Sequence, residues 1–369
     1  MAEDDTAPPK PKRRQPRKRQ SNDAPPAAEG EGEAAAAPAE VAGAGEQESA
    51  AAAQQPAAAT EPGPTEPAAG KPLVVTVFGG SGFVGRRLVA RLLDAGASVK
   101  IAMRDSKAAA VPKTKGSGSA EAIEASINDD AAVRAAVAGS TAVVNLVGIL
   151  HEGGGQSFAS VHVDGARRVA AAAKAAGVAR LVHMSALGAS PSSSSQYART
   201  KAAGEAAARV AFPEVSIVRP SIVFGPEDDF FNRFAAMAKI SPALPLIGGG
   251  TTRFQPVYVD DVAAAIVRLI EDEATSGQTY ELGGPSVYTF KELMEMMLRV
   301  KKITRALVPI PFFVAEIQGT MLQMLPTPPL TRDQVELLKT DNVLGGGAPG
   351  LGALGVSPTP LEAVLPTYL

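Results

Sequence analysis

The sequence predicts an α/β fold in which helices cover both faces of a parallel sheet, the arrangement called doubly wound. From Leu73 onward, short apolar segments alternate with longer stretches whose apolar residues recur at helical spacing. A glycine-rich turn, Gly79–Gly85, directly follows the first apolar segment and precedes the first helical one. The hydrophobic content of 45% in 369 residues is enough to bury a core for such a fold.

Residues 1–70 are predicted to lie outside this fold as a disordered tail. They are dominated by Ala, Pro, Glu and Gln and contain no aromatic residue, so burial cannot offset the entropy of ordering them. A basic cluster, Lys10–Arg19, is interpreted as a solvated arm, with docking to an acidic partner, anionic lipid or RNA as the alternative. The acidic residues Glu3, Asp4 and Asp5 argue against a mitochondrial presequence.

The strands and helices follow in alternating order. The predicted strands are Val74–Phe78, Ser98–Met103, Ala142–Val147, Leu181–Ser185 and Ser216–Arg219, with a weaker one near Ala122–Ala125. The predicted helices between them are Val84–Ala95, Ala131–Val137, Val161–Ala176 and Gln196–Ala211. Gly96 and Gly177 follow two helix ends, where a left-handed cap residue is expected. Beyond Pro220 the order gives way to Pro- and Gly-rich loops, with a strand at Gln255–Val259 and helices near Asp260–Ile270 and Thr289–Val300.

The turn after the first strand reads Gly79-Gly80-Ser81-Gly82-Phe83-Val84-Gly85. Gly79 would make the tight turn, Gly82 would let a pyrophosphate approach the backbone, and Gly85 would allow close packing of helix and strand. The helix N-terminus adds free N–H groups and a partial positive charge. This context predicts a dinucleotide-binding Rossmann domain over 71–225, followed by a cap region over 226–369 with some segments returning to the core. An ordinary glycine-rich turn is the alternative.

The second strand ends in Met103-Arg104-Asp105. An acid at this position would hold a ribose 2′-hydroxyl, whereas an Arg would pair with a 2′-phosphate. Because Arg104 comes first, NADP(H) is favoured, and Asp105 leaves NAD(H) possible. The further candidate cofactor contacts are Ser81, Phe83, Val84, Ser126, Ile127, Leu146, Val147, Gly148, Pro220 and Ile222.

Tyr197 and Lys201 are predicted on one face of a helix, because they are four residues apart. A nearby ammonium favours phenolate, so it would lower the pKa of the Tyr197 phenol from about 10 and let it act as a general acid or base. The ammonium could also hold the cofactor ribose, and Ser185 could polarise a substrate carbonyl. These three residues are the candidate catalytic group, and a surface Tyr/Lys pair is the alternative.

Composition excludes several other functions. From Lys71 onward there are 29 basic and 26 acidic residues, and this near-neutral body argues against nucleic acid as the main ligand. The absence of Cys removes disulfides, thiolate metal sites and Cys nucleophiles, and with three His no metal site is expected. No apolar run reaches the 18 residues of a membrane span, so attachment to a membrane would be peripheral. The segment 309–326 carries Phe313, Ile317, Met321 and Met324 on one helical stripe, which could lie on a membrane surface or a partner, or pack in the core.

The spacing Gly-x-x-Gly-x-x-Gly is similar to that of the extended and atypical short-chain dehydrogenases. The later chain resembles the nine-type alpha-subcomplex accessory subunits of respiratory complex I. The residues that carry this resemblance are Glu205, Ala211–Glu214, Val218–Asp228, Phe230–Phe234, Gln255–Val262, Thr331–Val335, Leu354–Val356 and Thr359–Glu362. The likeness extends over nearly all of 72–369, and the general short-chain dehydrogenases do not share its terminal motifs.

The resemblance implies a subunit that binds NADPH tightly, lies outside the electron-transfer chain and contacts other complex I subunits at the peripheral arm. Tyr197, Lys201 and Ser185 would then mainly hold the nicotinamide and ribose. Two departures weigh against turnover: Ser126-Ile127 replaces the Asp that usually contacts adenine, and His162 replaces an Asn that many relatives carry. An active NADP-dependent reductase, dehydrogenase or epimerase, and a dinucleotide sensor, are the alternatives. The Ala-rich composition suggests the cytoplasmic face of a bacterial inner membrane, with the cytoplasm or the mitochondrial matrix side as alternatives.

Overall fold

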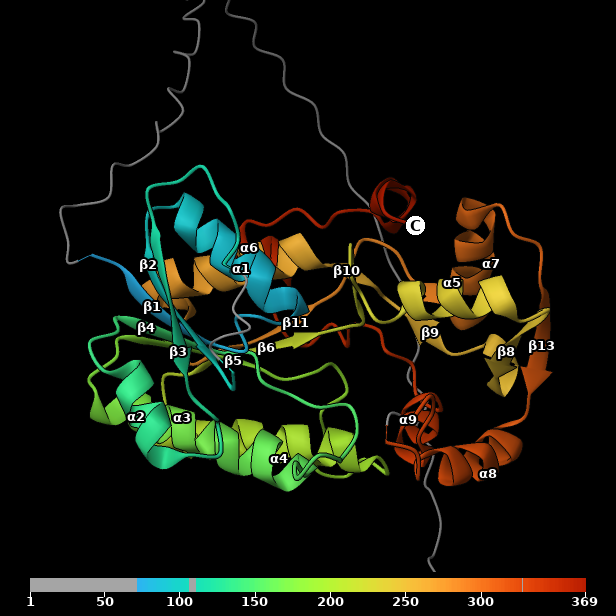
Figure 1. Ribbon diagram of the computed structural model, residues 1–369, viewed down its shortest axis with the longest axis horizontal. Helices are drawn as coiled ribbons and strands as arrows, with labels where there is room; N and C mark the ends of the chain where they lie inside the picture. Colours follow the sequence, from blue (N-terminus) through green and yellow to red (C-terminus); the bar gives the residue numbers. More distant parts are fainter. Residues whose placement is uncertain (1–71, 106–110, 327) are drawn as a thin grey trace, which may run out of the picture. The chain divides into compact units, whose positions relative to one another are not determined.

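The computed structural model describes residues 72–105, 111–326 and 328–369, so the predicted tail lies outside the described residues. A seven-stranded parallel sheet organises the body (Figure 1). Its strands, in spatial order, are β3 (Ser119–Glu124), β2 (Ser98–Met103), β1 (Val74–Phe78), β4 (Ala142–Asn145), β5 (Arg180–Met184), β6 (Ser216–Pro220) and β11 (Thr279–Leu282). The order reverses between β1 and β4, and such a switch point opens a crevice at the carboxyl ends of the strands.

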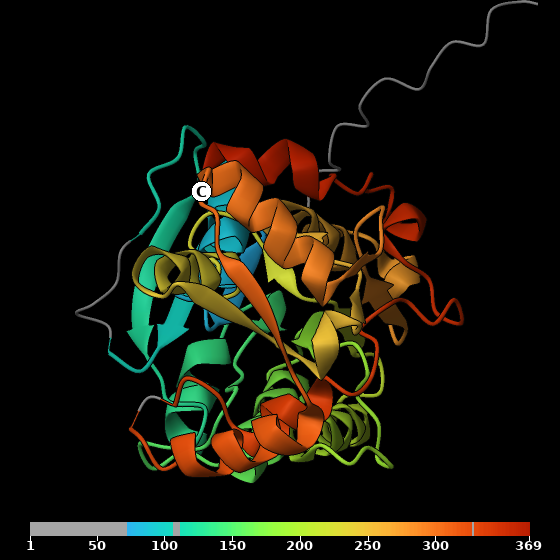
Figure 2. The same cartoon turned by 90° about the vertical axis from the view of Figure 1, so that its right-hand side faces the viewer.

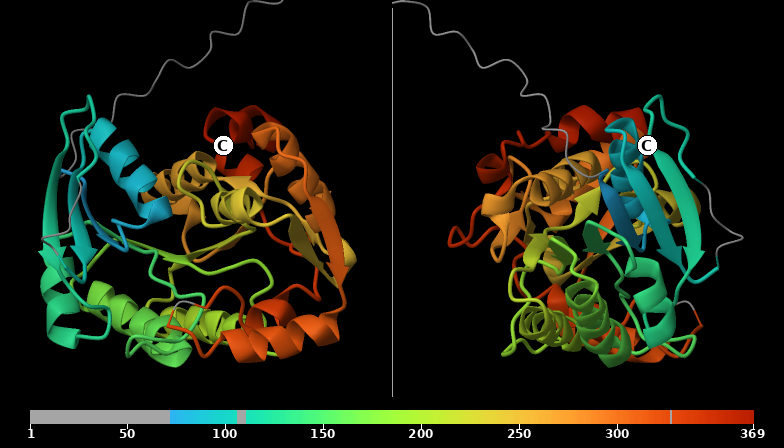
Figure 3. Two further views of the ribbon diagram at one scale, coloured as in Figure 1. Left: turned by 45° about the vertical axis from the view of Figure 1, so that its right-hand side comes forward. Right: turned by 90° about the vertical axis from the view of Figure 1, so that its left-hand side faces the viewer.

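Helices cover both faces of this sheet, which confirms the predicted fold class (Figures 1 and 3). One apolar core forms between the sheet and the helices α1 (Phe83–Asp94) and α6 (Val259–Glu271). A second core forms on the other face, beneath α2 (Asp130–Val137), α3 (Ala166–Ala175) and α4 (Gln196–Ala211). Gly96 and Gly177 follow α1 and α3 with φ values of 82° and 67°, so both predicted left-handed caps are confirmed.

Two predicted elements near the crevice are altered in the structure. The strand predicted at Ala142–Val147 ends at Asn145, because the Asn145 side chain itself accepts the N–H of Val147 (3.1 Å). The helix predicted at Val161–Ala176 begins with a π-helical turn, η2 (Ala159–Gly165). Such turns are frequent at functional sites. Here the turn lies against α4 at Gly204, where a Cβ would come within 2.1 Å of the His162 carbonyl oxygen.

The later part of the chain adds the strand β11 to the sheet and the helix α6 to one of its faces. It also builds a third core from α5 (Phe231–Ile240), α7 (Phe290–Lys301) and several aromatic side chains. Its other elements are β7 (Val223–Phe224) paired with β10 (Val257–Tyr258), β9 (Arg253–Phe254) with β12 (Tyr288–Thr289), β8 (Ala243–Ile247) with β13 (Ala306–Ile310), α8 (Phe312–Leu322), α9 (Arg332–Leu337) and α10 (Leu361–Val364). Short 3-10 turns lie at Gly248–Gly250, Glu273–Thr275, Leu351–Leu354 and Leu365–Thr367. The strand predicted at Gln255–Val259 is reduced to Val257–Tyr258, since Val259 already begins α6.

Helix α8 follows β13 on the outside of the molecule (Figure 2). Its inner face is buried through Ala315 and Gly319. The predicted stripe is exposed instead, with Phe313, Ile317, Met321 and Met324 showing 66%, 61%, 70% and 87% of their surface. Core packing of this stripe is therefore ruled out. Among the described residues, no helix combines the length and apolar character needed to cross a bilayer.

Candidate functional site

The glycine turn adopts the geometry that a phosphate loop needs. Gly79 has a φ of 80°, and the N–H of Gly82 donates to the Gly79 carbonyl (3.0 Å), which closes the turn. A Cβ on Gly85 would lie 2.2 Å from the Gly79 oxygen, so only glycine fits there. Gly82 precedes α1 without a side-chain cap, so the first N–H groups of the helix are available to an anion.

The segment after β4 lies beside this turn and reaches the Tyr/Lys helix. Leu146 donates its N–H to the Phe78 carbonyl (3.0 Å), and a Cβ on Gly79 would contact Leu146 at 3.4 Å. At Gly148 a Cβ would lie 3.7 Å from Lys201 Nζ. The structure thus brings the predicted contacts of the glycine turn, the β4 end and Lys201 to one edge of the sheet.

Lys201 and Ser185 are buried at the end of β5. Lys201 Nζ donates to the Met184 carbonyl (2.7 Å), and burial lowers the pKa of this ammonium to about 8, opposed by the charge of Glu205. The neighbouring Ser185 Oγ is buried and, within the described structure, has no hydrogen-bond partner. A buried hydroxyl without a partner is rare, and it fits a ligand that approaches from the crevice.

The pKa of the Tyr197 phenol shifts in the direction opposite to the predicted one. Burial raises the pKa of its phenol to about 12, whereas the sequence argument expected Lys201 to lower it. The reason is that burial of the phenol disfavours the charged phenolate, and this desolvation sets the direction of the shift. Tyr197 is therefore a neutral hydrogen-bonding group at pH 7.

His162 links the two sides of the site as a neutral imidazole. The N–H of Ile149 donates to His162 Nε2 (3.1 Å), so Nδ1 carries the proton and donates to Thr200 Oγ1 (3.0 Å). The His162 ring also meets the Tyr197 ring edge-on at 5.4 Å. Burial and the charge of Lys201 lower the pKa of His162 to about 3. Both ring nitrogens are used within the protein, so the geometry gives His162 a structural task.

The other predicted contacts lie further along the same sheet edge. Arg104 is exposed at the end of β2, where its guanidinium donates to Gln156 Oε1 (3.1 Å). Ser126 and Ile127 follow β3, and the Ile127 side chain is buried against Gly165. Pro220 ends β6, and the N–H of Ile222 is held by Asn342 Oδ1 (3.2 Å). The candidates thus extend from β2 and β3 at one end to β6 at the other.

Two residues near the site were missed from the sequence. Arg86, in the first turn of α1, donates to the Ser81 carbonyl (2.6 Å) and forms an ion pair with Glu227. A basic residue immediately after the third glycine is a usable signal for it. Asp333 contacts the start of α4 from 137 residues away, and no spacing rule could have found it.

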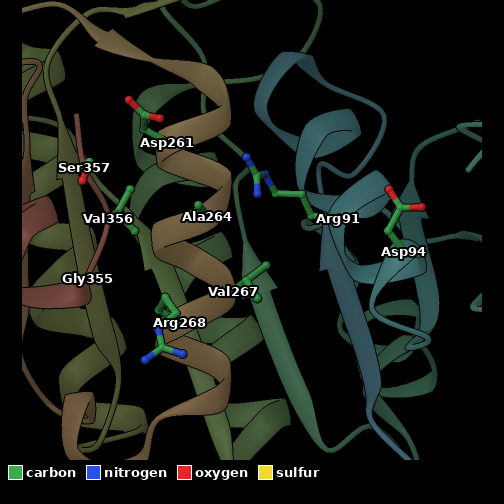
Figure 4. Close-up of a pocket in the computed structure, with 9 residues that line it drawn as sticks. All are labelled: Arg91, Asp94, Asp261, Ala264, Val267, Arg268, Gly355, Val356 and Ser357. Carbon is green, nitrogen blue, oxygen red and sulfur yellow. The ribbon is translucent and has the colours of Figure 1, made fainter. Parts of the chain in front are cut away.

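A separate groove of about 550 Å³ lies between α1, α6 and the segment 355–357 (Figure 4). Arg91 and Asp94, which line it, belong to the carboxyl end of α1, whereas the phosphate loop lies at the amino end. None of the predicted site residues lines this groove, so we place the functional site at the strand ends.

The fold and the glycine turn define a Rossmann-type dinucleotide-binding protein, and a nicotinamide dinucleotide fits the residues present. The Gly85 cradle admits no side chain, and the buried Ser185 hydroxyl has no hydrogen-bond partner among the described residues. Comparison with known proteins agrees: residues 75–283 match the model of the NAD dependent epimerase/dehydratase family.

Two relatives extend the match over most of the chain. The mouse (Mus musculus) protein named NADH dehydrogenase (ubiquinone) 1 alpha subcomplex subunit 9, mitochondrial, is 39% identical over 294 residues, which cover 79% of this chain and 78% of that one. The Arabidopsis thaliana protein of the same name is 38% identical over 289 residues, covering 75% and 72%. The chain therefore belongs to the NAD dependent epimerase/dehydratase family and, within it, to the group of these alpha subcomplex subunit 9 proteins.

A third relative and a solved structure are similar to this chain over different shares of its length. A Caulobacter vibrioides protein named ceramide reductase is 33% identical over 194 residues, covering 53% of this chain and 60% of that one. The Thermus thermophilus UDP-glucose 4-epimerase, solved as a complex with NAD, superposes with a TM-score of 0.59 at 19% identity, covering 80% of this chain and 97% of that one. At this identity the structural likeness supports the fold alone.

Proposed function

We propose that the chain is an NADP(H)-binding accessory subunit of respiratory complex I with a structural or assembly role, outside electron transfer. One observation carries the proposal: a complete phosphate loop, buried Lys201 and Ser185 and a half-buried Tyr197 are kept in a chain that matches the alpha subcomplex subunit 9 proteins over most of its length. Tyr197, Lys201 and Ser185 would hold the nicotinamide and ribose, and a bound nucleotide would stabilise the fold by linkage. When bound, such a nucleotide could accept or donate hydride.

The preference for NADP(H) over NAD(H) rests on Arg104. Its guanidinium is exposed at the end of β2, where the adenosine ribose of a dinucleotide lies in this fold. Its present partner is the neutral Gln156 side chain. A 2′-phosphate would offer Arg104 a charged, bidentate partner in place of this amide.

The proposed partners are other complex I subunits at the peripheral arm, with peripheral membrane contact through 309–326. Helix α8 is apolar on both faces: Ala315 and Gly319 are buried, and Phe313, Ile317 and Met321 face outward. Met324 and Leu325, which follow the helix in the sequence, are exposed as well. Such a patch marks an interaction site, and a lipid surface next to complex I suits it. We place the protein peripherally at the membrane that holds complex I.

Native mass spectrometry of membranes solubilised from the source cell tests the proposal. The expected result is that the chain travels with complex I subunits and carries NADPH. A chain that purifies alone, and whose deletion leaves complex I content and activity unaltered, would contradict it.

A reductase is the second candidate, favoured by the Caulobacter relative named ceramide reductase and by buried Lys201 and Ser185 at the end of β5, with Tyr197 one helical turn before Lys201. In that case Tyr197 would donate the proton to a substrate carbonyl while the nicotinamide supplies the hydride. Substrate-dependent loss of NADPH absorbance that disappears in Tyr197→Phe would select this function.

A further inference from the structure

The amino end of α4, the helix of Tyr197 and Lys201, is held by a side chain from far along the sequence. Asp333, in the first turn of α9, accepts hydrogen bonds from Ser195 Oγ (2.8 Å) and from the N–H groups of Gln196 (2.6 Å) and Tyr197 (3.0 Å). Ser195 Oγ in turn accepts the N–H of Ala198 (3.2 Å). The first turn of α4 is thus capped by two residues together, and the carboxylate is one of them.

This capping fixes the backbone of Tyr197 itself. The first N–H groups of a helix have no partner within the helix, and a negative charge beside them is favourable. Without Asp333 the first turn would fray, and Tyr197 would lose its position. Lys201 is one turn further on and is anchored separately on the Met184 carbonyl, so the effect would fall mainly on Tyr197.

Helix α9 is bound in turn to α8, and it lies between α4 and α8 (Figure 1). A Cβ on Gly319 of α8 would come within 2.9 Å of the Arg332 nitrogen, so the two backbones are in close contact. Lys339 Nζ forms an ion pair with Glu316 of α8 (2.8 Å) and with Glu336 of α9 (2.6 Å). These contacts join α8 and α9 into one unit, and Asp333 of this unit contacts the backbone of Tyr197.

We propose that Asp333 is a positioning residue of the nucleotide site, and that the α8–α9 unit sets nucleotide affinity through it. The inference rests on the proposed nucleotide binding. Because coupling between sites is reciprocal, a nucleotide that orders Tyr197 also stabilises α9.

The test compares NADPH binding, followed by nucleotide fluorescence, in the full chain and two variants. Asp333→Asn removes the negative charge that caps the amino end of α4. Thr289→Ala is the matched control, because Thr289 caps α7 by accepting the N–H of Glu292. We expect Asp333→Asn to weaken NADPH binding about tenfold, because the charge beside the helix is lost and the amide nitrogen that replaces Oδ2 cannot accept the N–H of Tyr197. Thr289→Ala should lower the melting temperature and leave NADPH affinity unchanged.

Hydrogen exchange distinguishes a positioning role of Asp333 from a purely structural cap, because only the positioning role makes NADPH binding alter amide exchange in α9. NADPH should slow amide exchange over 331–338 in the wild type and not in Asp333→Asn. Unchanged affinity and unchanged protection in Asp333→Asn would overturn the inference while leaving nucleotide binding intact. If Asp333→Asn does not fold, Asp333→Glu replaces it in the test. This variant keeps the charge and is expected to weaken NADPH binding less than tenfold. Wild-type NADPH affinity in Asp333→Glu, together with no effect of NADPH on amide exchange over 331–338, would overturn the inference. Failure of the wild type to bind any nicotinamide nucleotide would overturn the proposed function as well.

Discussion

Replacing Lys201 by Met is expected to stabilise the protein in the absence of nucleotide. Burial lowers the pKa of this ammonium from 10.5 to about 8, so carrying the charge in the folded protein at pH 7 costs about 3 kcal/mol. The variant also loses the hydrogen bond to the Met184 carbonyl, which is worth about 1 kcal/mol. The net gain is therefore about 2 kcal/mol, or about 5 °C in Tm.

The pH dependence gives the sign of the effect independently. Between pH 8 and 10.5 the unfolded chain keeps the Lys201 proton and the folded protein does not, so the free energy of unfolding rises with pH. From pH 7 to pH 9.5 the wild type should gain about 2 kcal/mol that Lys201→Met does not gain. Chemical denaturation at both pH values measures this difference, with Lys239→Met, at an exposed lysine of α5, as the control. A Lys201→Met protein that is less stable than the wild type at pH 7, with a difference independent of pH, would refute the reasoning.

Three further predictions concern the nucleotide and the membrane. Gly85→Ala should abolish heat stabilisation by NADPH, since its Cβ would lie 2.2 Å from the Gly79 oxygen, whereas Gly347→Ala, where a Cβ meets nothing within 4 Å, should leave it intact. Arg104→Leu should weaken NADPH binding about tenfold and leave NADH binding unchanged, as titration of each nucleotide would show; equal losses for both would exclude a 2′-phosphate contact. The double variant Ile317→Ser, Met321→Ser should sediment less with anionic vesicles at unchanged Tm, whereas Val210→Ser, at an exposed valine of α4, should sediment like the wild type. Wild-type sedimentation of the double variant would contradict a membrane contact through α8.

The sequence was a good guide to the sheet and a poorer one to the site. Apolar runs such as Val74–Phe78 lie in the middle of the sheet and are buried on both faces, so their pattern predicts the strands well. The pKa of Tyr197 was predicted with the wrong sign, because the burial of its phenol, which raises the pKa, arises only in the folded chain. Asp333 could not be found at all, since a cap that crosses 137 residues leaves no local pattern.

The charges around the site favour holding a nucleotide over moving protons. Burial and the charge of Lys201 lower the pKa of both His162 and His183 to about 3, so each is neutral at pH 7, and burial keeps the Tyr197 phenol protonated. His162, His183 and Tyr197 are therefore neutral at pH 7, and the Lys201 ammonium beside them is charged. A general acid works best when its pKa is near the working pH, and Tyr197, at about 12, is far from it. A fixed ammonium beside neutral hydrogen-bonding groups is suited to binding, so turnover would require the bound nucleotide itself to lower the pKa of Tyr197.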